Sequence, residues 1–134
     1  MYKYLLSALF MITLTACKAQ KDGELKPIDL TFEQKHIELG EVKRGDSRTF
    51  QYHFTNTGTE TIEIAIVSGC DCTTLDWTRG KIAPGKKGVI DVIFDSTEKE
   101  ASETVDVDIY LENINPKSDS QYFFILDYTF ELLQ

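Results

Sequence analysis

Residues 50–66 read FQYHFTNTGTETIEIAI, and this stretch carries the pattern that decides the fold. Apolar and polar residues alternate on both sides of a short polar connection, and a period of two residues is the period of a β-strand. Because Asn56 and Gly58 tolerate the positive φ of tight turns, we expect the two halves to pair as an antiparallel hairpin. The apolar positions are Phe50, Tyr52 and Phe54 in the first half and Ile62, Ile64 and Ile66 in the second.

The same alternation continues toward the C-terminus. Turn signals at Pro84-Gly85 and Asn115-Pro116 separate the segments, and none shows a helical period. About seven short strands in roughly 105 residues have the dimensions of an immunoglobulin-like domain. We therefore predict an all-β fold, an antiparallel immunoglobulin-like β-sandwich over residues 28–134, with a small closed barrel as the alternative. The inward residues are Ile90, Val92 and Phe94, then Val105, Val107, Ile109 and Leu111, then alternate residues from Tyr122 to Leu132.

The first 16 residues have the features of an export signal. Lys3 supplies positive charge, and residues 5–16 are almost uniformly apolar. This run is too short for a stable transmembrane helix, which needs about 20 apolar residues. It ends in Leu14-Thr15-Ala16-Cys17, which resembles the bacterial lipobox. The resemblance implies that residues 1–16 are removed and that Cys17 is acylated and becomes the new N-terminus.

Residues 17–27 are polar and predict a lipidated N-terminus followed by a flexible tether. Several acyl chains on one cysteine anchor a protein durably, whereas a single chain does not. Position two of the mature chain is Lys18 and not the Asp associated with retention in the inner membrane. By analogy with lipoprotein sorting, we expect a lipid-anchored protein of the bacterial cell envelope, at the outer membrane, either periplasmic or surface-exposed.

Composition restricts the partners and the chemistry. The 134 residues include 14 Lys+Arg and 22 Asp+Glu, which gives a net charge of −8. An acidic chain without a basic cluster repels phosphate backbones, so we expect no nucleic-acid partner. The spacings of the P-loop, the dinucleotide-binding loop, the serine-hydrolase elbow and the zinc-protease helix are also missing from the sequence. We therefore predict no enzymatic activity and no cofactor.

Several short motifs occur in an order that resembles a known bacterial family, the domain of unknown function number fifteen seventy-three, between residues 31 and 111. Members of that family look like the sandwich of major sperm protein and ASH domains. The resemblance implies a binding or scaffolding module without an established activity. The chain departs from the family pattern at Asp71, where Gly is usual, and at Leu39, where an aromatic residue is usual. The motifs are Leu39-Gly40-Glu41-Val42, Phe54-Thr55-Asn56-Thr57-Gly58, Cys70-Asp71-Cys72-Thr73, residues 82–88 and residues 92–96.

Cys70 and Cys72 carry the most specific chemistry in the chain, and two thiols in an oxidising compartment are expected to pair. In an extended strand their Cα atoms would lie roughly 6.6–6.8 Å apart, at the upper limit for a disulfide, so the backbone must tighten. Gly69 and Asp71 tolerate the unusual dihedral angles that would allow this. We interpret the pair first as structural. Thiol exchange and copper(I) binding are the alternatives, because strained disulfides are easily reduced and thiolates bind soft metals.

Three other residues, one tryptophan and two histidines, could suggest a site. Trp77 is expected to pack in the core, as a tryptophan commonly does beside the cysteines of such sandwiches. His36 and His53 are isolated in the sequence, and we expect both to be solvated, because a metal site needs further donors.

The final strand is too apolar for one buried face. Alternate residues from Tyr122 to Leu132 already form an inward face, so Phe123 and Ile125 must point the other way. Exposed apolar clusters mark interaction sites, and we predict that these two residues contact a partner protein of the envelope. Alternatively, the N-terminal segment or the loop at residues 113–118 folds over them.

Two functional hypotheses follow. The first is a membrane-anchored binding or scaffolding module that contacts an envelope protein, with membrane lipid as a second partner through acylated Cys17. The second is a thiol-redox or copper-handling module that uses Cys70 and Cys72.

Overall fold

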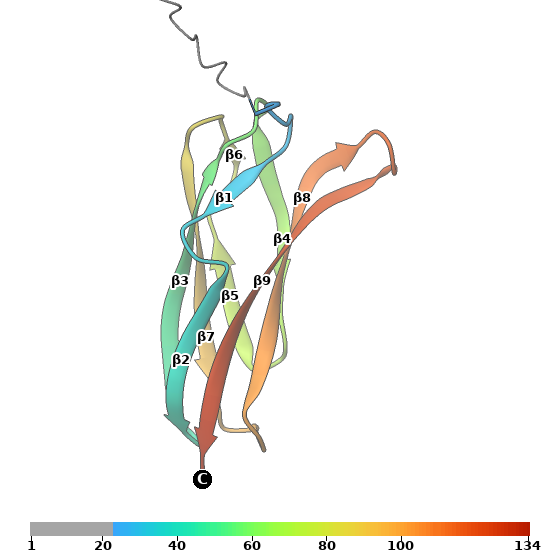
Figure 1. Cartoon of the computed structure of the whole chain (residues 1–134). Coiled ribbons are helices and arrows are strands. Elements are labelled where there is room, and N and C mark those ends of the chain that lie inside the picture. Colours follow the sequence, from blue (N-terminus) through green and yellow to red (C-terminus); the bar gives the residue numbers. More distant parts are fainter. Residues whose placement is uncertain (1–22) are drawn as a thin grey trace, which may run out of the picture.

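The computed structural model describes residues 23–134, and these residues form two β-sheets that pack face to face (Figure 1). Cys17, the predicted lipidation site, lies outside the described residues. The strands are β1 (Leu30–Phe32), β2 (His36–Lys43), β3 (Ser47–Asn56), β4 (Ile62–Ser68), β5 (Thr73–Trp77), β6 (Lys81–Ile82), β7 (Lys87–Asp95), β8 (Glu103–Asn115) and β9 (Ser120–Leu133).

One sheet has the strand order β1-β3-β7-β5 and the other β2-β9-β8-β4-β6. Both sheets have free edges, so the described residues form an open sandwich and not a barrel. The predicted fold class is confirmed, with nine strands in place of about seven because β1 and β6 are only three and two residues long. One pairing was not expected: β2 runs parallel to β9, whereas all other pairs are antiparallel.

The predicted hairpin between β3 and β4 is wrong. Strand β3 pairs with β1 and β7, whereas β4 pairs with β8 and β6 in the opposite sheet. Residues 57–61 therefore carry the chain from one sheet to the other. A polar connection with Asn and Gly fits both geometries, so its turn chemistry alone does not distinguish a hairpin from a crossing.

Asn56 explains why the chain crosses at this point. Its side chain is fully buried. The amide nitrogen donates hydrogen bonds to the carbonyl oxygens of Glu60 (2.9 Å) and Ile82 (3.0 Å), and Oδ1 accepts one from the Gly58 amide (3.0 Å). One side chain therefore joins the end of β3, the crossing and β6, and a buried amide must be satisfied in this way because leaving it unpaired is costly.

The inward faces of β7, β8 and β9 are as predicted, and they enclose an aromatic centre. Phe94 packs against Phe130 and Tyr128, with ring centroids 4.5 and 5.4 Å apart. In β4 the alternation breaks, because a register shift between Ile64 and Ile66 moves Val67 inward. Ile66, which the alternation places in the core, is consequently exposed, and an extra residue of this kind is how a β-bulge reverses the two faces of a strand.

Backbone hydrogen bonding of the domain begins before β1. The carbonyl oxygen of Pro27 accepts bonds from the amides of Thr59 and Glu60, both 3.0 Å long, and that of Lys26 accepts a longer one from Thr59. A Cβ atom at Gly58 would lie 2.8 Å from the Asp29 nitrogen, so only glycine allows this close approach. Lys26 and Pro27, the end of the predicted tether, are thus bonded to the sandwich.

We predict that Asn56→Ala lowers the free energy of unfolding by roughly 3 kcal/mol, because it removes three hydrogen bonds and leaves buried carbonyl groups without a donor. Urea titration followed by circular dichroism measures the change. Thr57→Ala, at the exposed neighbouring position, is the control and should change stability by less than about 0.5 kcal/mol. Equal stability of the two variants would contradict the role given to Asn56.

Candidate functional site

The two cysteines lie in a tight turn between β4 and β5, where Cys70 and Cys72 are joined by a disulfide. The Thr73 amide donates a 2.9 Å hydrogen bond to the Cys70 carbonyl, which closes a β-turn over residues 70–73. This turn brings the two cysteine Cα atoms to 5.2 Å, within the ordinary range for a disulfide. The expectation that Gly69 or Asp71 would adopt unusual dihedral angles is wrong, because neither has a positive φ.

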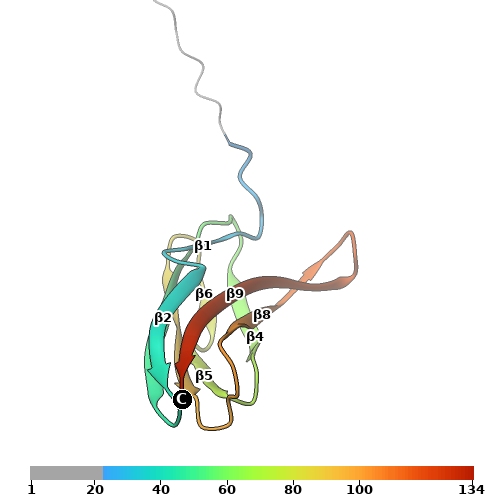
Figure 2. The ribbon, with the colours of Figure 1, turned by 60° about the horizontal axis from the view of Figure 1, so that its bottom comes forward.

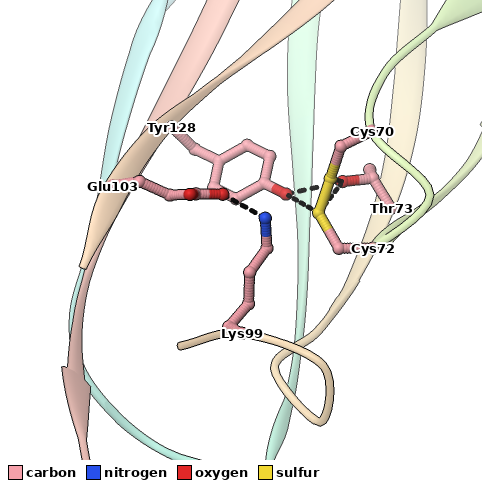
Figure 3. A network of polar contacts seen from close by, with 6 residues as sticks. All are labelled: Cys70, Cys72, Thr73, Lys99, Glu103 and Tyr128. Atoms are coloured by element: carbon pink, nitrogen blue, oxygen red, sulfur yellow. Dashed lines mark hydrogen bonds and ion pairs between the residues drawn. A yellow bond between two sulfur atoms is a disulfide. The ribbon is translucent and has the colours of Figure 1, made fainter. Parts of the chain in front are cut away.

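Two hydroxyl groups lie against the sulfur atoms (Figure 3). Thr73 Oγ1 is 3.4 Å from Cys70 Sγ and 3.5 Å from Cys72 Sγ, and the Tyr128 hydroxyl is 3.7 Å from Cys72 Sγ. The two hydroxyl oxygens are 2.5 Å apart, so one donates to the other. Burial raises the pKa of Tyr128, so its hydroxyl stays protonated and available as a donor.

An open groove of about 510 Å³ runs beside the disulfide. Among the described residues that line it, carboxylates dominate the charged groups, and the cation is Lys99, which is ion-paired with Glu103. The disulfide is half-buried, so its sulfur atoms contact the protein on one side and face this groove on the other. The groove is lined by Cys70, Asp71, Cys72, Asp95, Thr97, Glu98 and Lys99.

A second feature lies on the outer face of the five-stranded sheet. Phe123 and Ile125 are 57% and 54% exposed, so they do point away from the core, as the alternation predicts. Phe123 pairs with Tyr110, which pairs with Ile66 on β4. The Tyr110 and Phe123 rings stack with centroids 6.0 Å apart. We call the four residues Ile66, Tyr110, Phe123 and Ile125 the docking face.

The turn end of the β8–β9 hairpin projects from the body of the sandwich (Figure 2). Strand β2 pairs with β9 only from Asp127 onward, so residues 120–126 of β9 pair with β8 alone. The sequence identified Phe123 and Ile125 on this face but missed Ile66 and Tyr110. Their alignment depends on the β4 bulge and on pairing between distant strands, neither of which alternation reveals.

His36 is exposed, as predicted, but it is not isolated. Its Nε2 lies 2.6 Å from Glu38 Oε1, and its Nδ1 contacts the Asp127 carboxylate. These hydrogen bonds, first that of Glu38 and then that of Asp127, raise the pKa of His36 above 6.5. Asp127 also pairs with Asp106 across β8 and β9, and like charges at opposite positions repel. Protonated His36 offsets this repulsion.

Trp77 only partly follows the expectation of core packing. It lies on the edge strand β5, half-buried, with one part packed against the core. The guanidinium of Arg79 lies 3.7 Å from the centre of its ring and is itself 3.0 Å from Asp76. The ring therefore makes a cation–π contact in addition to its packing against the core.

Solved structures with a similar fold define the class of domain. The seventh PapD-like, or ASH, domain of human CEP192 is 10% identical and aligns over 99% of both chains with a TM-score of 0.59. A Porphyromonas gingivalis W83 protein of unknown function is 16% identical over 80% of this chain and 48% of its own, with a TM-score of 0.62. The secreted serine protease VesC of Vibrio cholerae is 20% identical over 80% of this chain and 24% of its own, with a TM-score of 0.58.

These likenesses show an immunoglobulin-like sandwich fold, similar to that of the ASH / PapD-like domain. The chain spans about half the length of the Porphyromonas protein and about a quarter of VesC. A sequence profile places it further: residues 30–123 match the family Protein of unknown function (DUF1573), and the chain belongs to that family. The search of curated proteins found no significant match.

Residues 23–134 contain no apolar helix of membrane-spanning length. No group of three or more His, Cys, Asp or Glu side chains gathers there in a way that could hold a metal ion.

We predict a pH-dependent contribution of His36 to stability. Because its pKa is higher in the folded chain, the contribution is complete below the unfolded value of about 6.5 and is lost as pH rises through the folded value. Urea titration should therefore show that His36→Gln is less stable than the native chain at pH 5.5 and that the difference shrinks at pH 8.5. The same change at His53, exposed on β3, is the control. A deficit independent of pH would contradict the prediction.

Proposed function

We propose that this chain is a lipid-anchored binding module of the bacterial cell envelope, which holds a partner protein on its docking face. The observation that carries the proposal is the row of Ile66, Tyr110 and Phe123, brought together by strand register on the outer face. Ile66, Phe123 and Ile125 are each more than half exposed. A solvated sheet face normally carries polar residues, and contiguous exposed apolar side chains mark interaction sites.

The surrounding charges indicate the chemistry of the partner. Asp108 pairs with Ile125, and the next outward pair along the hairpin is Asp106 and Asp127. An apolar centre with a carboxylate margin is complementary to a protein surface with an apolar centre and a Lys- or Arg-rich margin. The free side of β9 at residues 120–126 can add backbone hydrogen bonds to an extended partner segment.

The tether restricts where the partner lies. If Cys17 is acylated, residues 18–25 separate the lipid from the first residue bonded to the domain and span at most about 30 Å when fully extended. Residues 23–29 leave the sandwich at the end toward which the hairpin projects (Figure 1). The turn end of the hairpin therefore lies on the membrane side of the domain, and we propose that the partner on the docking face is an envelope protein close to the lipid.

We predict that Phe123→Ser combined with Ile125→Ser abolishes partner binding without unfolding the domain, because both side chains are already exposed to water. A photoreactive amino acid at position 110 crosslinks the bound partner in intact cells, and mass spectrometry of the adducts measures binding. Ile93→Ser is the matched control, since Ile93 is 45% exposed on the other sheet. Crosslinks that persist in the double variant, or that go to lipid, would contradict a protein partner on this face. A large drop in melting temperature would show that the side chains belong to the core.

We predict that Cys17→Ala leaves an unprocessed, unacylated chain, because the lipobox-like run then lacks its thiol. Intact-mass measurement and separation of membranes from soluble material report processing and anchoring. Cys70→Ser, which leaves the lipobox-like run untouched, should be acylated as in the native chain. Acylated mature protein from the Cys17→Ala variant would refute the anchor.

A further inference from the structure

The position of the Cys70–Cys72 disulfide is poorly suited to a purely structural role. It closes a ring that includes only one intervening residue, and the stabilisation from a disulfide falls as the closed loop shortens, because less chain entropy is removed from the unfolded state. It also lies in a turn outside both sheets, where the Cys70–Thr73 hydrogen bond already shapes the backbone. The bridge therefore adds little that the turn does not provide.

The two sulfur atoms differ in their surroundings. Cys70 lines two grooves, the one that contains Lys99 and a second one beside Ser68, Glu103 and Asp106, so it can be reached from two sides. Cys72 lines the first of these grooves and lies against the Tyr128 hydroxyl, at 3.7 Å, whereas Thr73 Oγ1 contacts both sulfurs, at 3.4 Å from Cys70 and 3.5 Å from Cys72 (Figure 3). Hydroxyl donors stabilise a thiolate, and a stabilised thiolate leaves more readily from a disulfide.

From this asymmetry we propose that Cys70–Cys72 is an exchange site that accepts two electrons from a dithiol of another protein. One thiolate of that dithiol attacks Cys70 Sγ, the bond between Cys70 and Cys72 breaks, and Cys72 leaves as a thiolate that accepts a hydrogen bond from the hydroxyl that does not donate to the other. The second thiolate of the dithiol then attacks the first dithiol sulfur, which is bonded to Cys70 in the mixed disulfide. A disulfide forms within the dithiol, and Cys70 is released. The dithiol is oxidised to a disulfide, Cys70 and Cys72 are reduced, and the two protons of the dithiol pass to the two released sulfurs.

The charges of the groove select the substrate. Asp71, Asp95 and Glu98 line it, and its cation Lys99 is paired with Glu103. An approaching cysteine flanked by Lys or Arg is attracted by these carboxylates, whereas one flanked by acidic residues is repelled. The substrate class is therefore a protein dithiol in a basic segment. Because the docking face contributes no residue to this groove, the exchange site stands apart from the proposed partner binding.

The test uses the full chain, purified in detergent, with two reduced synthetic peptides that carry a pair of cysteines between lysines or between glutamates. We expect the lysine peptide to reduce Cys70–Cys72 in the folded chain, with one peptide disulfide formed per chain, roughly tenfold faster than the glutamate peptide at low salt. The difference should shrink at high salt. Alkylation and mass measurement follow the thiols. Equal rates for both peptides at low salt, or reduction only after the domain is unfolded by urea, would overturn the proposal.

The roles of single atoms are tested separately. In Cys72→Ser, a lysine peptide with a single cysteine, supplied as its disulfide-linked dimer, should form a mixed disulfide on Cys70 and release the other peptide as a thiol, and in Cys70→Ser the yield on Cys72 should be several times lower. Tyr128→Phe and Thr73→Val should each move the pH profile of Cys72 alkylation in the reduced chain to higher pH, a readout that packing alone does not change. Unchanged profiles in both variants would overturn the role of the hydroxyls.

The double variant Phe123→Ser with Ile125→Ser separates the two proposals. The lysine peptide should reduce its Cys70–Cys72 disulfide at the native rate, so failure of the docking proposal is distinguishable from failure of the exchange proposal.

Discussion

Asn56 is the constraint on which the arrangement of the two sheets depends. Its buried amide bonds to the crossing and to β6, so the last residue of β3 determines where the chain leaves one sheet and how the next strand enters the other. Ser96 has a comparable position at the end of β7. Its buried hydroxyl donates to the carbonyls of Lys43 and Asp46, and it accepts from the Gly45 amide. The β2–β3 connection is thus held at the end of β7, and buried polar groups fully satisfied in this way specify one arrangement over others.

The strand faces could be predicted from the sequence because burial imposes a period of two on each strand separately. Val105 to Leu111 and the inward residues of β9 are where alternation places them, as are the outward Phe123 and Ile125. Pairing between strands could not be predicted in the same way. The crossing after Asn56 uses residues that also suit a hairpin, and the parallel partner of β2 lies far away in sequence. Which strands pair is determined by tertiary contacts, and local turn chemistry does not encode it.

The candidate sites show the same difference between what single segments reveal and what contacts between segments determine. The chemistry of Cys70 and Cys72 is evident from the residues, but the turn that joins them has no positive φ at Gly69 or Asp71, and the hydroxyl beside Cys72 comes from Tyr128 on β9. Half of the docking face also could not be predicted from the sequence, because Ile66 is exposed only as a result of the bulge in β4. In both places the missing information is a contact between segments that are 40 or more residues apart.

The parallel pairing of β2 with β9 has a consequence for the biogenesis of the chain. His36 is matched with Asp127, 91 positions later, so the five-stranded sheet cannot be completed until the last strand has been synthesised. Contacts with such long sequence separation delay folding, because the closure entropy of the loop is spent before they form. A chain that emerges N-terminus first therefore lacks its closing strand during most of its synthesis. Such a delay would suit the export that we propose, because the five-stranded sheet cannot close before β9 is available.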